Sequence, residues 1–325
     1  MVFAHICADC IIDNVLSPAE TAALASRVSD QAHAEQEAGY FDQSPDGSRQ
    51  NISTLMNKGQ EFQRLLDHPA VMPLLKHVVG QEMQLSISNA IIVKPGGPQM
   101  PLHTDQWWMP QPQRKSRPMR IPVGSVDRGR AHTADWASES DEFIAPPVAA
   151  QAIFLASDFV SGNGATMIVP GSHLAGRLPR PEEASDHTLS TAVPLEAAKG
   201  CCVVYDARLW HGTGVNTGDW VDRSTGLPWR LGIFSLYCAP WARPQENMVL
   251  GALAQALDGM SDEQKTLLGF RAWHAYGRVG MSGFPSHQNK GITEGWEEAG
   301  SLIVQGDAIA NGGVGRLTRR HSGSG

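Results

Sequence analysis

The residues best suited to chemistry in this sequence are an imidazole and a carboxylate two positions apart, His103 and Asp105. They come just after an apolar run and the turn at 95–98, which has the sequence Pro-Gly-Gly-Pro. Because alternate residues of an extended strand face the same side, both side chains can converge on one point. His211 follows a second apolar run and adds another imidazole. Two His and one carboxylate can bind a divalent metal ion and leave its other positions open, the arrangement of non-haem Fe(II) oxygenases.

An isolated His-x-Asp triplet carries little information, because it arises by chance in many proteins and a hydrogen-bonded structural His explains it better. The segments that follow it are more specific. They are Pro-Gly-Ser-His at 170–173, Trp-His-Gly at 210–212 and Arg-Leu-Gly-Ile-Phe-Ser-Leu-Tyr at 230–237. In this order and at this spacing, the part of the chain from Leu85 to Trp241 resembles the phytanoyl-CoA dioxygenase family of Fe(II)/2-oxoglutarate-dependent oxygenases.

The resemblance implies roles for five residues. His103, Asp105 and His211 would bind the iron. The guanidinium of Arg230 would bind the far carboxylate of 2-oxoglutarate, since a planar fork of N–H donors matches a carboxylate and fixes its orientation. The hydroxyl of Thr166 would contact the same cosubstrate, although a β-branched strand residue needs no such role.

The spacing of the expected anchor departs from the family. Arg230 comes 19 residues after His211, which is longer than is usual in the family, and Arg223 stands at the shorter spacing. Arg223 lies in the segment 219–226, Asp-Trp-Val-Asp-Arg-Ser-Thr-Gly, which is typical of an inserted loop. We therefore expect Arg230 to be the anchor and keep Arg223 as the alternative.

The implied cofactors are Fe(II), the cosubstrate 2-oxoglutarate and O₂, with succinate and CO₂ as products. Hydroxylation of an unactivated C–H bond is the default outcome, and desaturation or rearrangement stays open. Asp105 argues against halogenation, because related halogenases have a small residue there that leaves a coordination position for chloride.

The substrate is expected to be a small, largely apolar molecule of natural-product or secondary metabolism, since the chain has low charge and several Trp near the motif. Trp107 and Trp108 follow the ligands and are expected to wall the substrate cavity, although core packing explains at least one of them equally well. Three alternatives remain. They are an acyl-CoA or carrier-linked hydroxylase of the same family, a redox-inert cupin-like metal enzyme without 2-oxoglutarate, and a non-catalytic binding protein.

Three further residues near the motifs are weaker candidates. His173 of the Pro-Gly-Ser-His segment is not a ligand position in the family, and we expect it to end a strand and to hydrogen-bond locally. Asn89 and Gln99, on and after the strand that leads to the metal motif, are candidates for polar groups of the pocket. A structural role is the alternative for both amides.

Short strands must position these residues. Turn residues separate the predicted strands, and few helices intervene, which favours a sandwich or jelly roll over a parallel α/β sheet. The predicted strands are 85–93, 149–156, 166–169, 201–206 and 230–238. The N-terminal third is expected to be helical after a short opening strand. One helix begins after Ser17, with Pro18 at its first position and Glu20 completing a capping box, and a second helical region spans 62–79, interrupted at its two prolines.

We therefore expect a mainly β protein with flanking helices and a double-stranded β-helix core, that is, a cupin-like jelly roll, which forms one oxygenase domain over 1–325. Residues 1–82 would be a helical N-terminal cover. Residues 83–244 would be the core, with a long insertion at 109–147. Residues 245–325 would be a C-terminal helical region with a flexible tail.

Composition and charge argue against other classes. Of the 325 residues 42% are hydrophobic and 18% are charged, which is typical of a globular protein. The net charge of −7, with scattered Lys and Arg, argues against nucleic-acid binding. No apolar stretch reaches the ~18 residues of a membrane span, and the first residues lack a secretory signal, so we expect a cytoplasmic protein. The five Cys are predicted to be buried thiols, and the oligomeric state stays open between monomer and homodimer.

Overall fold

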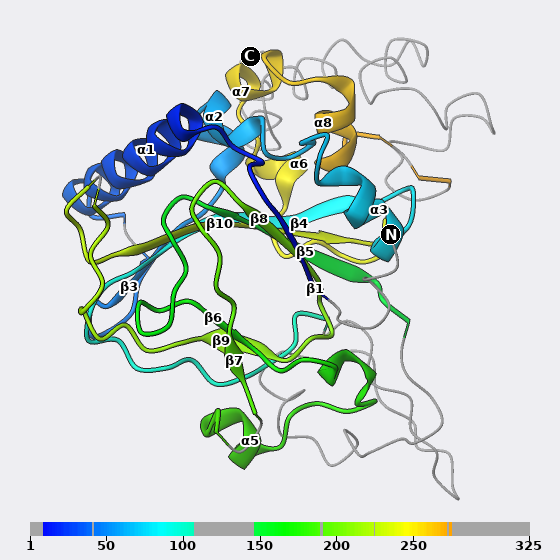
Figure 1. Ribbon diagram of the computed structural model, residues 1–325. Helices are drawn as coiled ribbons and strands as arrows, with labels where there is room; N and C mark the ends of the chain where they lie inside the picture. Colours follow the sequence, from blue (N-terminus) through cyan, green and yellow to red (C-terminus); the bar gives the residue numbers. More distant parts are fainter. Residues whose placement is uncertain are drawn as a thin grey trace, which may run out of the picture.

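Two antiparallel β-sheets face each other in the computed structural model, which describes residues 9–40, 42–106, 146–188, 191–223, 225–271 and 273–274 (Figure 1). The larger sheet has the order β1-β8-β5-β10-β4-β3-β2. Its strands are β1 (Asp9–Ile12), β2 (Asp42–Gln43), β3 (Arg49–Ile52), β4 (Gln84–Val93), β5 (Ala149–Leu155), β8 (Cys202–Asp206) and β10 (Arg230–Cys238). The smaller sheet has the order β7-β6-β9, with β6 (Thr166–Ile168), β7 (Val193–Pro194) and β9 (His211–Thr213).

The chain crosses between the two sheets as it proceeds. It passes from β5 in the larger sheet to β6 and β7 in the smaller one, returns to β8, crosses again to β9 and ends in β10. Strands that alternate between two facing sheets form a jelly roll. The expected mainly β, jelly-roll fold class is confirmed. The five strands predicted from the sequence correspond to β4, β5, β6, β8 and β10, and their ends differ by one residue at most.

The helices cover the outer face of the larger sheet, on the side away from the smaller sheet (Figure 1). They are α1 (Pro18–Glu37), α2 (Gln60–Gln63), α3 (Met72–Val79), α6 (Met248–Gly251), α7 (Ala254–Asp258) and α8 (Asp262–Leu267), whereas α5 (Pro181–Ser185) lies beyond the smaller sheet. The expected capping box is confirmed, because the Ser17 hydroxyl accepts from the Glu20 amide at 3.2 Å and the Glu20 carboxylate accepts from the Ser17 amide at 2.8 Å. Pro18 is the first helical residue.

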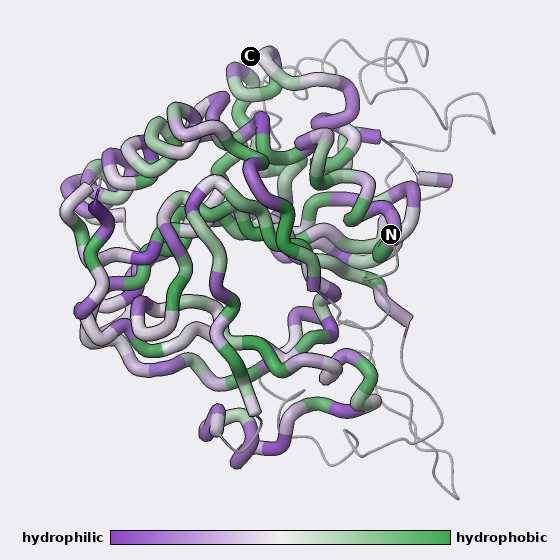
Figure 2. The backbone as a smooth tube through the Cα atoms, in the orientation of Figure 1, coloured by the Kyte–Doolittle hydropathy of each residue, from purple (hydrophilic) through white to green (hydrophobic). Residues whose placement is uncertain are grey.

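Strand periodicity divides the hydrophobic core into two parts. In β5, Ala152 and Phe154 pack under the helices, whereas Ile153 and Leu155 pack between the sheets. This is the alternation that a strand buried on both faces must show. In Figure 2 the central strands of the larger sheet are mostly hydrophobic, whereas α1 carries many hydrophilic residues on the outside. The space between the sheets, where the second core cluster lies, also contains the site described below.

The first 82 residues contribute more strand than the sequence indicates. Besides β1, they supply β2 and β3, which extend the sheet beyond β4. The sequence of β3 is Arg-Gln-Asn-Ile, so it has no apolar run by which a strand is usually found. The proposed domain boundaries stay a prediction. Most of the insertion 109–147 and most of the C-terminal tail lie outside the described residues.

Among the described residues, no helix has both the length and the apolar character needed to cross a membrane. The cytoplasmic location stays a prediction.

One buried amide connects the end of β4 to the start of its neighbour β10. The Asn216 side chain is fully buried, and its nitrogen donates to the carbonyls of Val93, at the end of β4, and Pro228, just before β10, at 3.1 and 3.0 Å. Its oxygen accepts from the Gly218 amide at 2.9 Å.

We predict that Asn216→Ala lowers the free energy of unfolding by about 2 kcal/mol, because it leaves buried backbone groups unpaired. Urea denaturation followed by circular dichroism measures this. Thr217→Ala, at an exposed position in the same loop, is the control and should change stability by no more than about 0.5 kcal/mol. Equal stabilities of the two variants would show that the Asn216 amide does not hold these strand ends.

Candidate active site

Two histidines lie directly opposite each other on neighbouring extended segments. The His103 amide donates to the His211 carbonyl at 2.9 Å, and the His211 amide donates to the His103 carbonyl at 3.0 Å. Their imidazole centroids are 4.4 Å apart. The close approach depends on Gly212, where a Cβ atom would lie 2.5 Å from the Met100 carbonyl oxygen. The glycine of Trp-His-Gly therefore allows the segment that carries His103 to lie against β9.

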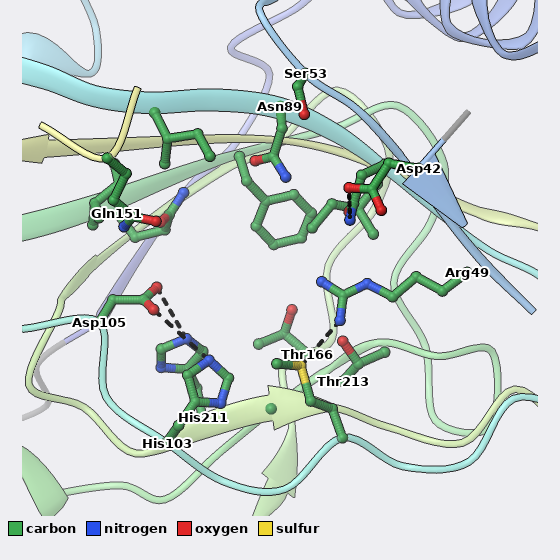
Figure 3. Close-up of a pocket in the computed structure, with 18 of the residues that line it drawn as sticks. Asp42, Arg49, Ser53, Asn89, His103, Asp105, Gln151, Thr166, His211 and Thr213 are labelled. Atoms are coloured by element: carbon green, nitrogen blue, oxygen red, sulfur yellow. Dashed lines mark hydrogen bonds and ion pairs between the residues drawn. The ribbon is translucent and has the colours of Figure 1, made fainter. Parts of the chain in front are cut away.

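Asp105 completes a cluster of three potential metal ligands (Figure 3). Its carboxylate oxygens lie 3.7 Å from His103 Nε2 and 3.3 Å from His211 Nε2, and one ligand atom from each residue lies within 4.8 Å of the others. Neighbouring ligands at about 2.1 Å from a metal ion lie roughly 3 Å apart, so small movements would close the cluster around an ion. The structure thus brings together the three residues that the sequence predicted as ligands.

The hydrogen bonds of the two imidazoles decide which nitrogen faces the carboxylate. His103 Nδ1 lies 2.9 Å from the Pro101 carbonyl, and His211 Nδ1 lies 2.9 Å from the Leu209 carbonyl. A carbonyl oxygen only accepts, so each Nδ1 must carry the hydrogen. In the neutral rings both Nε2 lone pairs then face the Asp105 carboxylate. A proton or a metal ion between these atoms removes their repulsion, and His, His and carboxylate are ligands that suit a divalent metal ion.

The turn between β8 and β9 is held by an ion pair that the sequence analysis did not identify. Asp206 Oδ1 accepts from the Arg208 amide at 2.9 Å, and Oδ2 accepts from Arg208 Nη2 at 2.6 Å. Within this turn, the Ala207 carbonyl accepts from the Asp105 amide at 2.8 Å. The same turn therefore positions Asp105 and leads directly into His211.

The cluster lies in the wall of a cavity of about 420 Å³ between the two sheets, within the usual size range of small-molecule sites. The larger sheet contributes polar and apolar side chains to the wall, and the smaller sheet contributes Thr166, His211, Gly212 and Thr213. The main contributors from the larger sheet are Arg49, Asn51, Ile87, Asn89, Ile91, Gln151, Tyr205, Phe234 and Leu236. Thr166, which was expected to contact the cosubstrate, thus lines the same cavity as the three potential metal ligands.

A basic residue that the sequence did not indicate lies across the cavity from the cluster. Arg49, on β3, extends toward Thr166 and Thr213, which are paired across β6 and β9 (Figure 3). Its Nη1 lies 3.1 Å from Met100 Sδ. Arg49 lies in a short polar strand outside every motif, so only its pairing with β4 reveals that it faces the cavity.

Arg230 lies at the same level of the larger sheet as Arg49. Both pair with Val93, from opposite sides of β4. The Arg230 side chain is fully buried, its Nε donates to the Gly164 carbonyl at 2.9 Å, and its Nη1 and Nη2 have no hydrogen-bond partner among the described residues. Burial, and after it the charge of Arg49, lowers the pKa of Arg230. A desolvated cation beside a second cation is a place where an anion is strongly favoured.

Two aromatic rings pack against the Arg230 guanidinium. The guanidinium carbon lies 4.8 Å from the Phe159 ring centroid and 5.4 Å from that of Phe234. Phe234 is in the cavity wall, whereas Arg230 is not among the described residues that line it. The alternative anchor, Arg223, is exposed in the loop before β10 and does not line the cavity either. The Phe234 ring thus lies in the cavity wall and next to the Arg230 guanidinium.

The weaker candidates fall in different places. Asn89 lines the cavity, whereas Gln99 is bonded to the Ser185 carbonyl at 2.7 Å and does not. His173 is buried in a 3₁₀ turn after β6, outside the metal cluster, and its Nδ1 has no hydrogen-bond partner in the described part of the chain, unlike the local bond that we expected. Burial lowers the pKa of His173. Trp107 and Trp108 lie outside the described residues, so their role stays a prediction.

Two solved structures with a similar fold are EctD and SnoK. EctD from S. alaskensis superposes with a TM-score of 0.52 and 17% identity, over 74% of this chain and 78% of EctD. A non-heme alpha ketoglutarate dependent carbocyclase, SnoK from nogalamycin biosynthesis, superposes with a TM-score of 0.50 and 18% identity, over 74% of this chain and 84% of SnoK. At these identities the likeness shows the fold alone.

Curated relatives and a family profile show the sequence relationship. Dioxygenase af480 from Aspergillus fumigatus is 28% identical over 204 residues, which are 63% of this chain and 53% of the relative. Dioxygenase swnH1 from Arthroderma benhamiae is 29% identical over 41% of this chain and 39% of its own length. The matches therefore span about half or less of these relatives. The profile described as Phytanoyl-CoA dioxygenase (PhyH) matches residues 9–224, more than half of the chain, and this protein therefore belongs to the phytanoyl-CoA dioxygenase family.

Proposed function

We propose that this protein is an Fe(II)- and 2-oxoglutarate-dependent dioxygenase that hydroxylates an unactivated C–H bond of a small molecule and releases succinate and CO₂. The observation that carries the proposal is the convergence of His103, Asp105 and His211, whose potential ligand atoms all lie within 4.8 Å of one another in the wall of the cavity. Two His and a carboxylate are the ligands that non-haem Fe(II) oxygenases use. Relatives named as dioxygenases support the reaction class.

In this proposal His103, Asp105 and His211 hold the metal ion. Bound Fe(II), with 2-oxoglutarate and O₂, would supply the oxidising chemistry. The protein holds the ligands in place, since the Pro101 and Leu209 carbonyls fix the orientation of both imidazole rings. Such outer hydrogen bonds also make the ring nitrogens better ligands.

We assign the far carboxylate of 2-oxoglutarate to Arg230, assisted by Arg49 and Thr166. Nη1 and Nη2 of Arg230 support this role, because they are buried donors that have no acceptor among the described residues. Arg49 and Thr166 both line the cavity, and the Arg49 guanidinium extends toward Thr166. A carboxylate bound there would relieve the repulsion between the two guanidinium groups.

The side chains of the cavity wall indicate the polarity of the substrate. Phe234 and Leu236 provide the apolar surface expected from the sequence, but Asn89 and Gln151 add amide groups to the same wall (Figure 3). We therefore propose a small natural-product-like molecule with both apolar surface and hydrogen-bonding groups. A cavity of about 420 Å³ must hold the cosubstrate as well, so the bulk of an acyl-CoA would have to lie outside it.

We predict that Asp105→Ala and His211→Ala abolish metal binding and the weak visible absorption band that Fe(II) and 2-oxoglutarate give together. Anaerobic reconstitution followed by absorption spectroscopy and metal analysis measures both. His173→Ala, which removes a buried imidazole outside the cluster, is the matched control and should retain the band. If Asp105→Ala retains the band, the metal assignment is wrong. A wild-type protein that binds metal but gives no band with 2-oxoglutarate would instead be a redox-inert metal enzyme.

We also predict that Arg230→Ala raises the dissociation constant of 2-oxoglutarate by about 100-fold, because it removes one partner of a buried charge pair, and leaves metal binding intact. Arg49→Ala should give a smaller rise, roughly tenfold. Anaerobic titration of the Fe(II) protein with 2-oxoglutarate gives these constants. The exposed Arg223 provides the control, and a large effect of Arg223→Ala with none of Arg230→Ala would transfer the anchor to Arg223.

A further inference from the structure

Gln106 is a buried amide that directly follows Asp105, one of the proposed metal ligands. Only 2% of the residue is exposed. Unlike Asp105, it is not among the described residues that line the cavity, so it is not placed to contact a bound ligand. A buried side-chain amide needs partners for its donors and for its acceptor. The positions of these partners therefore show which parts of the chain Gln106 connects.

Both ends of the Gln106 amide bond to the backbone that leads into β5. Nε2 donates to the Pro146 carbonyl at 2.7 Å, and Oε1 accepts from the Val148 amide at 2.7 Å. A carbonyl only accepts and a backbone N–H only donates, so these two partners fix the orientation of the side-chain amide. The Val148 carbonyl in turn accepts from the Ala239 amide, just after β10, at 2.8 Å. Gln106 thus holds a segment that is itself attached to the larger sheet.

The backbone of the same residue closes a ring of hydrogen bonds. The Gln106 and Asp105 amides both donate to the Ala207 carbonyl, at 3.2 and 2.8 Å. The Ala207 amide donates to the Ala149 carbonyl at 3.1 Å, and Ala149 directly follows Val148, the partner of the Gln106 side chain. The ring joins the segment that carries the ligands, the turn after β8 and the start of β5. Removing the Gln106 amide opens this ring beside Asp105.

The ring bears on Asp105 more directly than on the two histidines. His103 and His211 exchange two backbone hydrogen bonds with each other, and a backbone carbonyl fixes each imidazole. Asp105 lies two residues beyond that pair, where the ring holds its peptide through Ala207. A ligand that is already fixed in its bound position loses less conformational entropy when the metal ion arrives.

On the basis of the proposed function, we propose that Gln106 is a positioning residue that raises the affinity of the metal site by holding Asp105 in place. It acts through the backbone of Asp105 and needs no contact with the metal ion, the cosubstrate or the substrate. An apolar side chain of the same length would fill the same space. It would leave the Pro146 carbonyl and the Val148 amide without the partner that Gln106 provides.

The test titrates the metal-free protein with Co(II), whose visible absorption reports binding and ligand geometry without 2-oxoglutarate. We expect Gln106→Met to raise the dissociation constant of Co(II) roughly 10- to 100-fold, the range typical of residues that orient metal ligands. At saturation the variant should also give an altered Co(II) band, because the Asp105 carboxylate is held less firmly. A loss of overall stability without a loss of positioning would change neither the constant nor the band.

Gln63 on α2 provides the matched control. It is also buried, its Nε2 donates to the Met56 and Ala256 carbonyls at 2.8 and 3.3 Å, and it does not line the cavity. Gln63→Met should lower the midpoint of urea unfolding about as much as Gln106→Met, yet bind Co(II) as wild type does. An equal loss of Co(II) affinity in both variants would show that affinity follows overall stability, and it would overturn the proposal.

Gln106→Asn covers the case in which Gln106→Met does not fold. Asn is one methylene group shorter and cannot reach both Pro146 and Val148, so this variant should also bind Co(II) more weakly. Wild-type affinity and an unchanged band in a folded Gln106 variant would refute the positioning role while leaving the dioxygenase assignment intact. Failure of the wild-type protein to bind Co(II) would instead remove both the proposed metal site and the role of Gln106.

Discussion

The site depends on the two backbone hydrogen bonds that place His103 directly opposite His211. A pair that exchanges both bonds has its side chains on the same side of the sheet, so the two imidazoles must be neighbours. Asp105 follows two residues later and faces the same way because strand side chains alternate. One local pairing thus assembles a ligand set from parts of the chain that are more than a hundred residues apart. Gly212 is the residue that makes the pairing sterically possible.

The two sheets contribute different chemistry to the cavity. The smaller sheet and the segment beside it hold the metal cluster and two threonines, all fixed by short strands and a tight turn. The larger sheet lines the cavity with side chains from β2, β3, β4, β5, β8 and β10. Arg49, in the wall, and Arg230, behind it, both lie at the level of Val93. The smaller sheet therefore presents the proposed reacting centre, and the larger sheet provides the surface against which a ligand is oriented. The described helices contribute no residue to the cavity wall, since α5 lies beyond the smaller sheet and the others pack against the other face of the larger sheet.

The sequence predicted the parts of this arrangement that follow from local rules. Apolar runs located five strands, and the Ser17-Pro18-Glu20 pattern located the start of α1, because periodicity and capping act over a few residues. The positions of Arg49 and Tyr205 were not predicted, since facing the cavity depends on which strand pairs with which. Arg49 faces it only because β3 joins β4, and Tyr205 only because β8 pairs with β5 in a register that aligns it with Gln151. No spacing within either strand contains that information.

Electrostatics connect the two ends of the cavity. At one end two lone pairs and a carboxylate face one another, and at the other end Arg230 is buried near the charge of Arg49. Charged groups gain more from a partner of opposite charge in a region that water enters poorly. In the proposed function, a divalent cation binds at the first end and the dianion 2-oxoglutarate at the second. If the dianion also chelates the metal ion, as proposed, each ligand strengthens the binding of the other by the same factor. On this proposal, the protein binds the metal ion and 2-oxoglutarate together more tightly than it binds either one alone.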